Sequence, residues 1–402
     1  MISLYRTALE AVGCTVTTVA EPHPFYLDDF THSLQTPNWL FRPIRSTSFY
    51  PFEKLRRQLV KLRLLSRPLQ EWLLYLKYRD HLDILLIVGD GLVRRDLTDF
   101  RYLKQRGVRI GQAFFGGDVR DWQTFKQQFG VDLSSVTDRE IDNRNFNEIV
   151  FRLRKAELYA DALFSLPDQM GLAIRPYFKL DVPFSLSGGM VKPRGRAIPK
   201  VVHIESQKPY KGEPYIYAAV ERLKQDSESF EFRSYKCLSH EEVLAVLRDA
   251  DILVDETMIF GPGILGHEAV ACGCALATKM QPEHAMCNYV CNIQDDDIVE
   301  PLRVLIRDRD TRVRNSLICQ ELLNANLSPA AVGRKILQCL GFNETSTFEP
   351  EKLIEPHFFV DEYIRPIGHE LNDRNKMLTL EVAKKHGVSE DRINRLRVQG
   401  MI

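Results

Sequence analysis

The sequence predicts an α/β protein whose chain is divided into two domains, each built on a mostly parallel β-sheet. At 402 residues the chain is long enough for two or three domains. Short apolar or β-branched runs alternate with amphipathic helical patterns, which is typical of βαβ units. A stretch rich in proline and glycine, residues 181–199, interrupts this alternation and predicts an exposed linker between the two domains.

The first domain is expected over residues 1–180. Apolar residues at helical spacing before Gly13 predict an opening helix, and the β-branched residues 15–19 predict a short strand after it. Residues 22–51, rich in aromatics and prolines without a clear period, predict a long surface loop. Further strands are predicted at 83–88, 108–115 and 162–165, and helical segments at 52–77, 96–105 and 119–160.

The second domain is expected over residues 200–342, where the alternation resumes. Strands are predicted at 201–204, 230–232, 252–254 and 275–278. Helices are predicted after Pro214, after a capping box formed by Ser239 and Glu242, and from Leu265 to a C-terminal cap at Gly273. The remaining residues, 343–402, predict a helical tail that ends in a helix–turn–helix, and we expect a packing or partner-binding hairpin rather than a DNA-binding one.

Composition and charge exclude several classes of protein. Lys and Arg total 54 and Asp and Glu total 54, so the formal net charge is zero and no overall field favours nucleic acid. The longest apolar runs are much shorter than the roughly 20 residues that cross a bilayer, and the start lacks the apolar core of a secretory signal. Eight scattered cysteines fit a reducing compartment and do not repeat at zinc-site spacing. We therefore expect a cytoplasmic protein without a metal or other cofactor.

A basic segment raises the question of membrane contact. Residues 54–67 alternate lysines and arginines with leucines, as an interfacial helix does. Such a helix would place the protein peripherally at the inner face of a membrane. The other interpretation is a solvated helix packed through its leucines, because one basic helix provides only modest attachment.

Two segments of the second domain suit phosphate binding. In the first, Lys208 and Lys211 follow a strand end and precede Gly212 and a helix, the place where α/β sheets bind ligands. Ammonium groups there suit phosphate oxygens, although exposed loop lysines are also common. His203 and Ser206 belong to the same strand end, and His203 is either a satisfied core histidine or a ligand contact.

The second segment runs from a strand end through a glycine-rich loop into a helix. Gly261 and Gly263 precede Ile264 and Leu265, whose backbone amides at a helix start attract phosphate or sugar oxygens. Glu268, in the same helix, can accept hydrogen bonds from ribose hydroxyls. The alternative is a tight loop in which the glycines only permit unusual backbone angles.

These segments resemble the donor-binding domain of glycosyltransferase family 4 proteins, which share the two-domain GT-B fold. In that family a His-x-Pro-Ser type strand end is followed by a basic residue and Lys-Gly. The matching residues here are His203, Ser206, Lys208, Lys211 and Gly212, with Glu205 in place of proline. Further matches are the helix start 239–243, the strand 250–255 and the Glu-Ala-x-Ala-x-Gly type run 268–273.

The resemblance implies two Rossmann-like domains that face a central cleft and a nucleotide-sugar-dependent hexosyltransferase. Lys208, Lys211, Gly212 and the loop 261–265 would hold the donor diphosphate, and Glu268 the ribose. Transfer would proceed with retention and without metal to a glycan, lipid or small-molecule acceptor, in a role such as cell-surface polysaccharide biosynthesis. Asp118 and Arg120 of the first domain would orient the acceptor, or pair with one another.

Three features depart from the family pattern. Phe115 stands where the first domain of the family has a histidine, and Phe260 stands where many members carry a second glutamate. The chain also opens on a helix where the family has its first strand. A non-catalytic nucleotide- or glycan-binding or scaffold protein with the same fold is therefore the alternative, and a nucleotide-sugar epimerase is a third interpretation.

Overall fold

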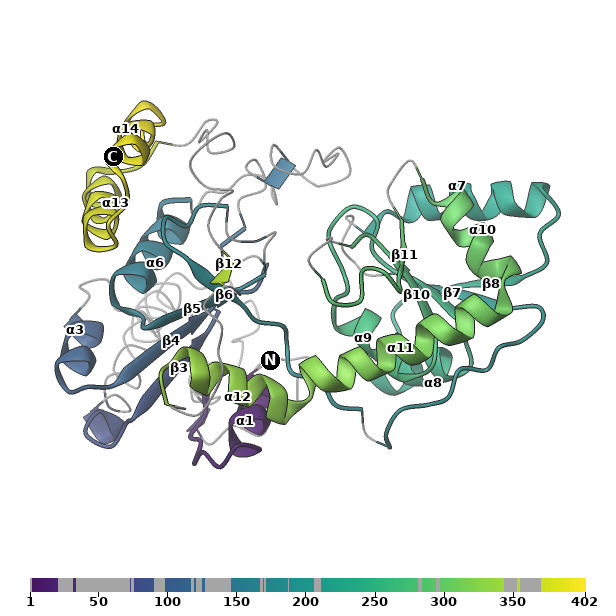
Figure 1. The fold of residues 1–402 in the computed structure, drawn as a ribbon, viewed down its shortest axis with the longest axis horizontal. Coiled ribbons are helices and arrows are strands. Elements are labelled where there is room, and N and C mark those ends of the chain that lie inside the picture. Colours follow the sequence, from purple (N-terminus) through teal and green to yellow (C-terminus); the bar gives the residue numbers. More distant parts are fainter. Residues whose placement is uncertain are drawn as a thin grey trace, which may run out of the picture.

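The computed structural model describes two five-stranded β-sheets with helices around them (Figure 1). The residues that it describes are 2–20, 32–33, 73, 76–89, 98–116, 119–120, 125–126, 146–166, 169, 171–186, 188–205, 211–280, 284–293, 297–342, 353–354 and 370–402. Predictions for residues 22–51, 52–77 and most of 119–145 lie largely outside this part of the chain.

The first sheet has the strand order β12-β6-β5-β4-β3. Its strands are β3 (Ile84–Val88), β4 (Arg109–Ala113), β5 (Ala162–Ser165), β6 (Tyr177–Lys179) and β12 (Leu353–Ile354). The first four are parallel, and β12 is antiparallel to β6. Helices α3 (Thr98–Gln105) and α6 (Phe146–Tyr159) connect these strands, so the predicted βαβ arrangement is confirmed.

The short strand predicted at 15–19 is wrong. The structure has no regular element at 14–18, and only β1 (Val19–Ala20) pairs, with β2 (His32–Ser33), in a separate small sheet. A β-branched run becomes a strand only where a neighbouring strand accepts its backbone hydrogen bonds. Here Val16 instead packs against the apolar cluster beneath α1 (Ile2–Glu10).

The second sheet is parallel throughout and has the order β11-β10-β9-β7-β8. Its strands are β7 (Lys200–Ile204), β8 (Glu231–Tyr235), β9 (Ile252–Val254), β10 (Ala275–Thr278) and β11 (Cys291–Asn292). The predicted strands at 201–204, 252–254 and 275–278 are confirmed. The strand predicted at 230–232 lies slightly later, and β11 was not predicted.

Both faces of this second sheet are covered by helices. Val202, Leu253 and Leu276 belong to an apolar cluster with α8 (His240–Arg248), α9 (Ile264–Ala271) and α11 (Arg309–Leu327). Their neighbours in the strands, such as Val201 and Ile252, belong to the opposite cluster, with α7 (Glu213–Gln225) and α10 (Val299–Arg307). Alternate strand residues therefore face opposite layers, as in a doubly wound α/β domain.

The C-terminal part of the chain returns to the first sheet (Figure 1). Helix α12 (Pro329–Cys339) packs on α1 so closely that a Cβ at Gly333 would lie 2.1 Å from the carbonyl oxygen of Ala8. The last two helices, α13 (Asp373–Lys385) and α14 (Glu390–Val398), join α6 in the first apolar cluster. The end of the predicted second domain and the predicted tail thus both contribute to packing around the first sheet.

The segment between the two sheets contains neither helix nor strand among its described residues, 180–186 and 188–199. This agrees with the character of the predicted linker. The boundaries 1–180, 181–199, 200–342 and 343–402 remain predictions.

Candidate functional site

The strand order of the second sheet reverses around β7, because the chain continues from β7 to β8 on one side and then to β9 on the other. Ligands of open parallel sheets bind beyond the carboxyl ends of the strands at such a switch point. Lys211 follows β7 and Asp255 follows β9. Their side chains meet, with 2.6 Å between Lys211 Nζ and Asp255 Oδ1, so the switch point holds an ion pair.

Gly212 allows the two loops to interlock. Its φ of +83° lies in the left-handed region, and a Cβ there would lie 1.8 Å from Thr257 Oγ1. The amide of Thr257 donates to the carbonyl oxygen of Lys211 over 3.2 Å. A residue with a side chain at 212 would separate these loops, so Gly212 permits their close approach.

The ion pair of Lys211 and Asp255 is buried but incompletely bonded. The two side chains are 9% and 1% exposed. Burial opposes the charge on Lys211, but Asp255 and Glu256 outweigh it, and the pKa of Lys211 is raised. Asp255 Oδ2 has no hydrogen-bond partner in the described structure. A buried carboxylate oxygen without a donor calls for a further hydrogen-bond donor, such as water or a hydroxyl group.

The predicted glycine loop leads into helix α9 at the same edge. Gly263 is the N-cap, and no side chain caps the helix. A Cβ on Gly266, in the first turn, would lie 3.5 Å from Asp255 Oδ2, so the ion pair lies beside this helix start. The amides of Ile264 and Leu265 lie in the first turn, where a helix cannot satisfy its own donors. They suit an external anion.

Gly261 has a packing role in that loop. Its amide donates to the carbonyl oxygen of Lys279 over 2.8 Å, and a Cβ would lie 2.5 Å from Thr278 Oγ1. The loop therefore lies against the end of β10, which sets where helix α9 begins.

Glu268, the predicted ribose contact, is nearly buried in α9. Its carboxylate Oε1 lies 2.8 Å from Nε2 of His240, the first residue of α8. Burial raises the pKa of Glu268, and the hydrogen bond from His240 opposes that rise. His240 was not among the residues predicted for the site, although its place directly after the predicted N-cap Ser239 was a usable signal.

His203 is fully buried in β7. Its Nδ1 lies 2.8 Å from the carbonyl oxygen of Val254, while Nε2 has no partner within the described part of the chain. Burial lowers the pKa of His203. Glu205, which replaces the proline of the family pattern, accepts hydrogen bonds from Tyr217 and Ser234.

The predicted first-domain residue Arg120 lies beside Phe125. Its guanidinium lies 5.1 Å from the ring centre of Phe125. Phe125 in turn contacts Phe260, with 6.4 Å between ring centres, and Lys279 lies over Phe260. An aromatic contact thus joins the first-domain segment to the glycine loop, which sequence analysis did not anticipate. Asp118, Ser206 and Lys208 lie outside the described residues.

A group of titratable side chains lies where the linker passes α9. His267 of α9 is buried, with Nε2 unpartnered in the described structure, and its ring lies 5.9 Å from that of Phe184. His284 Nε2 lies 4.0 Å from Asp181 Oδ1. Burial lowers the pKa of each histidine to about 4. Both rings are therefore neutral at neutral pH.

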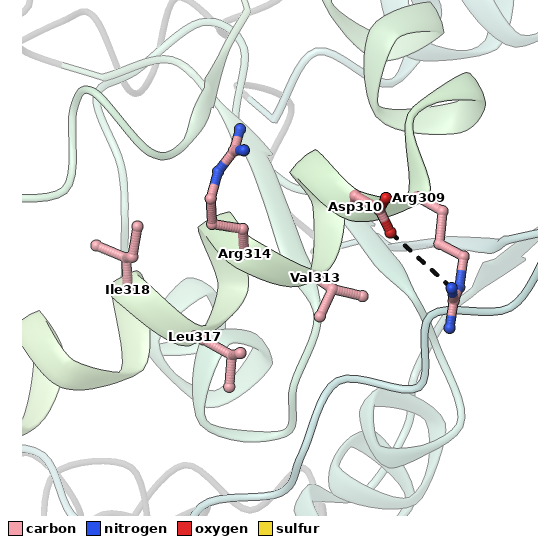
Figure 2. Close-up of a pocket in the computed structure, with 6 residues that line it drawn as sticks. All are labelled: Arg309, Asp310, Val313, Arg314, Leu317 and Ile318. Carbon is pink, nitrogen blue, oxygen red and sulfur yellow. Dashed lines mark ion pairs between the residues drawn. The ribbon is translucent and has the colours of Figure 1, made fainter.

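A shallow groove of about 390 Å³ lies elsewhere, on helix α11 (Figure 2). It is lined by Arg309, Asp310, Val313, Arg314, Leu317 and Ile318. Arg309 and Asp310 form a long ion pair of 3.9 Å. None of the predicted site residues lines this groove.

Two further searches concern the described residues alone. They contain no group of three or more His, Cys, Asp or Glu side chains that could hold a metal ion. Their helices include none that is long and apolar enough to cross a membrane.

Comparison with known proteins finds similarity in structure but not in sequence. No family model and no curated protein matches the chain. A trehalose-6-phosphate synthase, OtsA, is 12% identical over 84% of this chain and 93% of its own, with a TM-score of 0.50. An E. coli structure with bound UDP-2-fluoro glucose is 12% identical over 71% and 78%, with a TM-score of 0.47. TarM of S. aureus is 11% identical over 64% and 55%, with a TM-score of 0.43. Together with the two parallel sheets, the first of these likenesses shows that the chain has a GT-B-like fold.

Proposed function

We propose that this protein is a glycosyltransferase that moves a sugar from a nucleotide-sugar to a glycan, lipid or small-molecule acceptor, with retention. The observation that carries the proposal is the meeting of Lys211 and the uncapped start of α9 at the switch point of the second sheet. The OtsA likeness supports the proposal through the fold.

The chemistry follows from where charge develops. The bond between the sugar's anomeric carbon and the diphosphate oxygen breaks, and the oxygen of an acceptor hydroxyl forms the new bond to that carbon as its proton passes to the departing diphosphate. Negative charge grows on the leaving diphosphate. The Lys211 ammonium and the amides of Ile264 and Leu265 would stabilise that charge, so the proposal needs no divalent metal.

The remaining predicted residues take supporting roles. Lys208 would add a second cation to the diphosphate, and Glu268 would accept from the ribose. Asp118 and Arg120 would orient the acceptor from the first domain. We further propose a cytoplasmic role in cell-surface polysaccharide biosynthesis, with peripheral membrane contact through residues 54–67, which lie outside the described residues.

Calorimetric titration with UDP, GDP and ADP tests the donor site. We expect one nucleotide to bind the wild type and Lys211→Ala to weaken that binding about tenfold or more, since a charged phosphate contact is lost. Lys224→Ala is the matched control, because Lys224 is exposed at the far end of α7 and pairs with Glu221. Lys211→Arg, which keeps the charge, should retain most of the affinity.

Turnover then separates enzyme from binder. Transfer or hydrolysis of the matching nucleotide-sugar supports the transferase, and binding without turnover supports the non-catalytic alternative. Absence of binding for all three nucleotides would contradict the transferase and favour the non-catalytic scaffold alternative.

A further inference from the structure

A buried carboxylate is stable as an anion only when donors replace the water that it has lost. Glu268 is 8% exposed, and the hydrogen bond that the structure records for its side chain comes from His240. Because a carboxylate oxygen accepts, Nε2 of His240 carries the proton. His240 thus provides a donor that Glu268 needs.

The backbone around His240 is held firmly. Ser239 is the N-cap of α8, and its side chain accepts from the amide of Glu242. The Glu242 carboxylate accepts from the amide of Ser239 over 2.7 Å, which completes the capping box. His240 is therefore presented from a fixed helix start.

The exposure of the two partners differs sharply. The His240 side chain is 70% exposed and that of Glu268 is 11% exposed. One edge of the imidazole is bound to Oε1, and most of the ring faces solvent. A core contact would bury both partners, whereas this pair lies at the border of the site.

We propose that His240 is a positioning residue that orients the Glu268 carboxylate to accept from the 2′- and 3′-hydroxyls of a ribonucleotide, and that it thereby makes the site select ribose. The inference rests on the proposed function, because it needs the nucleotide to lie with its ribose at Glu268. It adds a residue on a second element, α8, to the donor site on α9.

A merely structural contact between α8 and α9 has a different consequence. It would affect all ligands of the domain equally, because it would alter the packing and not one contact. A positioning role affects only ligands that have the ribose hydroxyls. The two roles are therefore separable by ligand analogues.

The test is calorimetric titration with the nucleoside diphosphate that binds the wild type and with its 2′,3′-dideoxy analogue. We expect His240→Ala to weaken binding of the ribonucleotide about tenfold and binding of the analogue less than about twofold. His240→Gln, which retains a side-chain N–H donor, should recover most of the loss. Glu241→Ala, at an exposed neighbouring position of α8, is the control and should bind like the wild type.

The outcomes are distinct. Unchanged ribonucleotide affinity in His240→Ala, or equal weakening for both ligands, would overturn the positioning role and leave the proposed function intact. A wild type that binds no nucleoside diphosphate would overturn the proposed function and this inference with it. Equal thermal midpoints of the variants would show that the difference does not come from folding.

Discussion

Two buried ion pairs, one around each sheet, differ in how completely they are bonded. Arg154 of α6 donates to Glu157 over 2.6 Å and also to Thr379 and the carbonyl oxygen of Leu172. Glu157 further accepts from the amide of Ile174. In the Lys211–Asp255 pair, by contrast, one carboxylate oxygen has no partner in the described structure.

This difference teaches what each pair is for. A closed network leaves no group for a ligand, and it ties α6 to the tail helix α13 through Thr379. The open pair keeps bonding capacity at the switch point, at a cost in desolvation that only a ligand or water removes. The first pair ties two helices together, and the second leaves an acceptor at the switch point without a donor among the described residues.

The largest expected effect is on the closed network. Arg154→Met leaves Glu157 buried without its main partner, and we expect a loss of about 3–5 kcal/mol in the free energy of unfolding. Urea unfolding measures the total loss in the free energy of unfolding, and hydrogen exchange of the amides of β4 and β5 shows where in the fold the protection is lost. Arg397→Met, at a half-exposed surface pair with Glu390, is the control and should leave the midpoint unchanged. A loss below about 1 kcal/mol would show that the network is dispensable.

The open pair should separate stability from binding. Lys211→Met alone leaves Asp255 as an unpaired buried charge, and we expect a loss of about 3 kcal/mol. Adding Asp255→Asn removes that charge and should restore most of the stability without restoring nucleotide binding. Urea unfolding and calorimetry of the single and double variants measure the two effects. Recovery of binding in the double variant would contradict the role of Lys211 as the diphosphate cation.

The smallest expected effect per residue is the pH dependence of the region beside the open pair. His267 and His284 have folded pKa values of about 4 against an ordinary 6.5. Because the unfolded state binds more protons between these values, stability is fully present above pH 6.5 and is lost as the pH falls toward 4. We expect about 2 kcal/mol lost per histidine at pH 5, measured by urea unfolding.

A glutamine variant is the control for that pH dependence. His284→Gln removes one titrating group. The free energy of unfolding should then fall less between pH 6.5 and pH 5, by the contribution of one histidine. An unchanged curve would show that His284 does not titrate on unfolding in this range.

Much of the second domain could be predicted from local pattern. The alternation of Val201 and Val202 between two helix layers, and the capping box at Ser239, are properties of neighbouring residues. The parallel strand arrangement also predicted that several segments share one sheet edge, because parallel strands end at the same edge. These segments are Lys211, Gly212 and the loop 261–265.

The predictions failed where a segment depends on a distant partner. Residues 15–19 have strand composition, but only Val19 belongs to a strand in the structure. Asp255 was visible as a strand end, yet its pairing with Lys211 joins residues 44 positions apart. The contact of Phe125 with Phe260 joins segments that no local pattern relates.

The sequence by itself determined the α/β class, the order of the elements in the second domain and the loops that could meet a phosphate. It does so because helical and strand periodicity, glycine positions and caps act within a few residues. Only the tertiary structure decided that Lys211 meets Asp255, that His240 holds Glu268 and that the C-terminal helices pack around the first sheet. Apolar periodicity predicts that a face is buried, but it does not identify the segment that covers the face. A buried charge predicts that a group needs a partner, but it does not identify that partner.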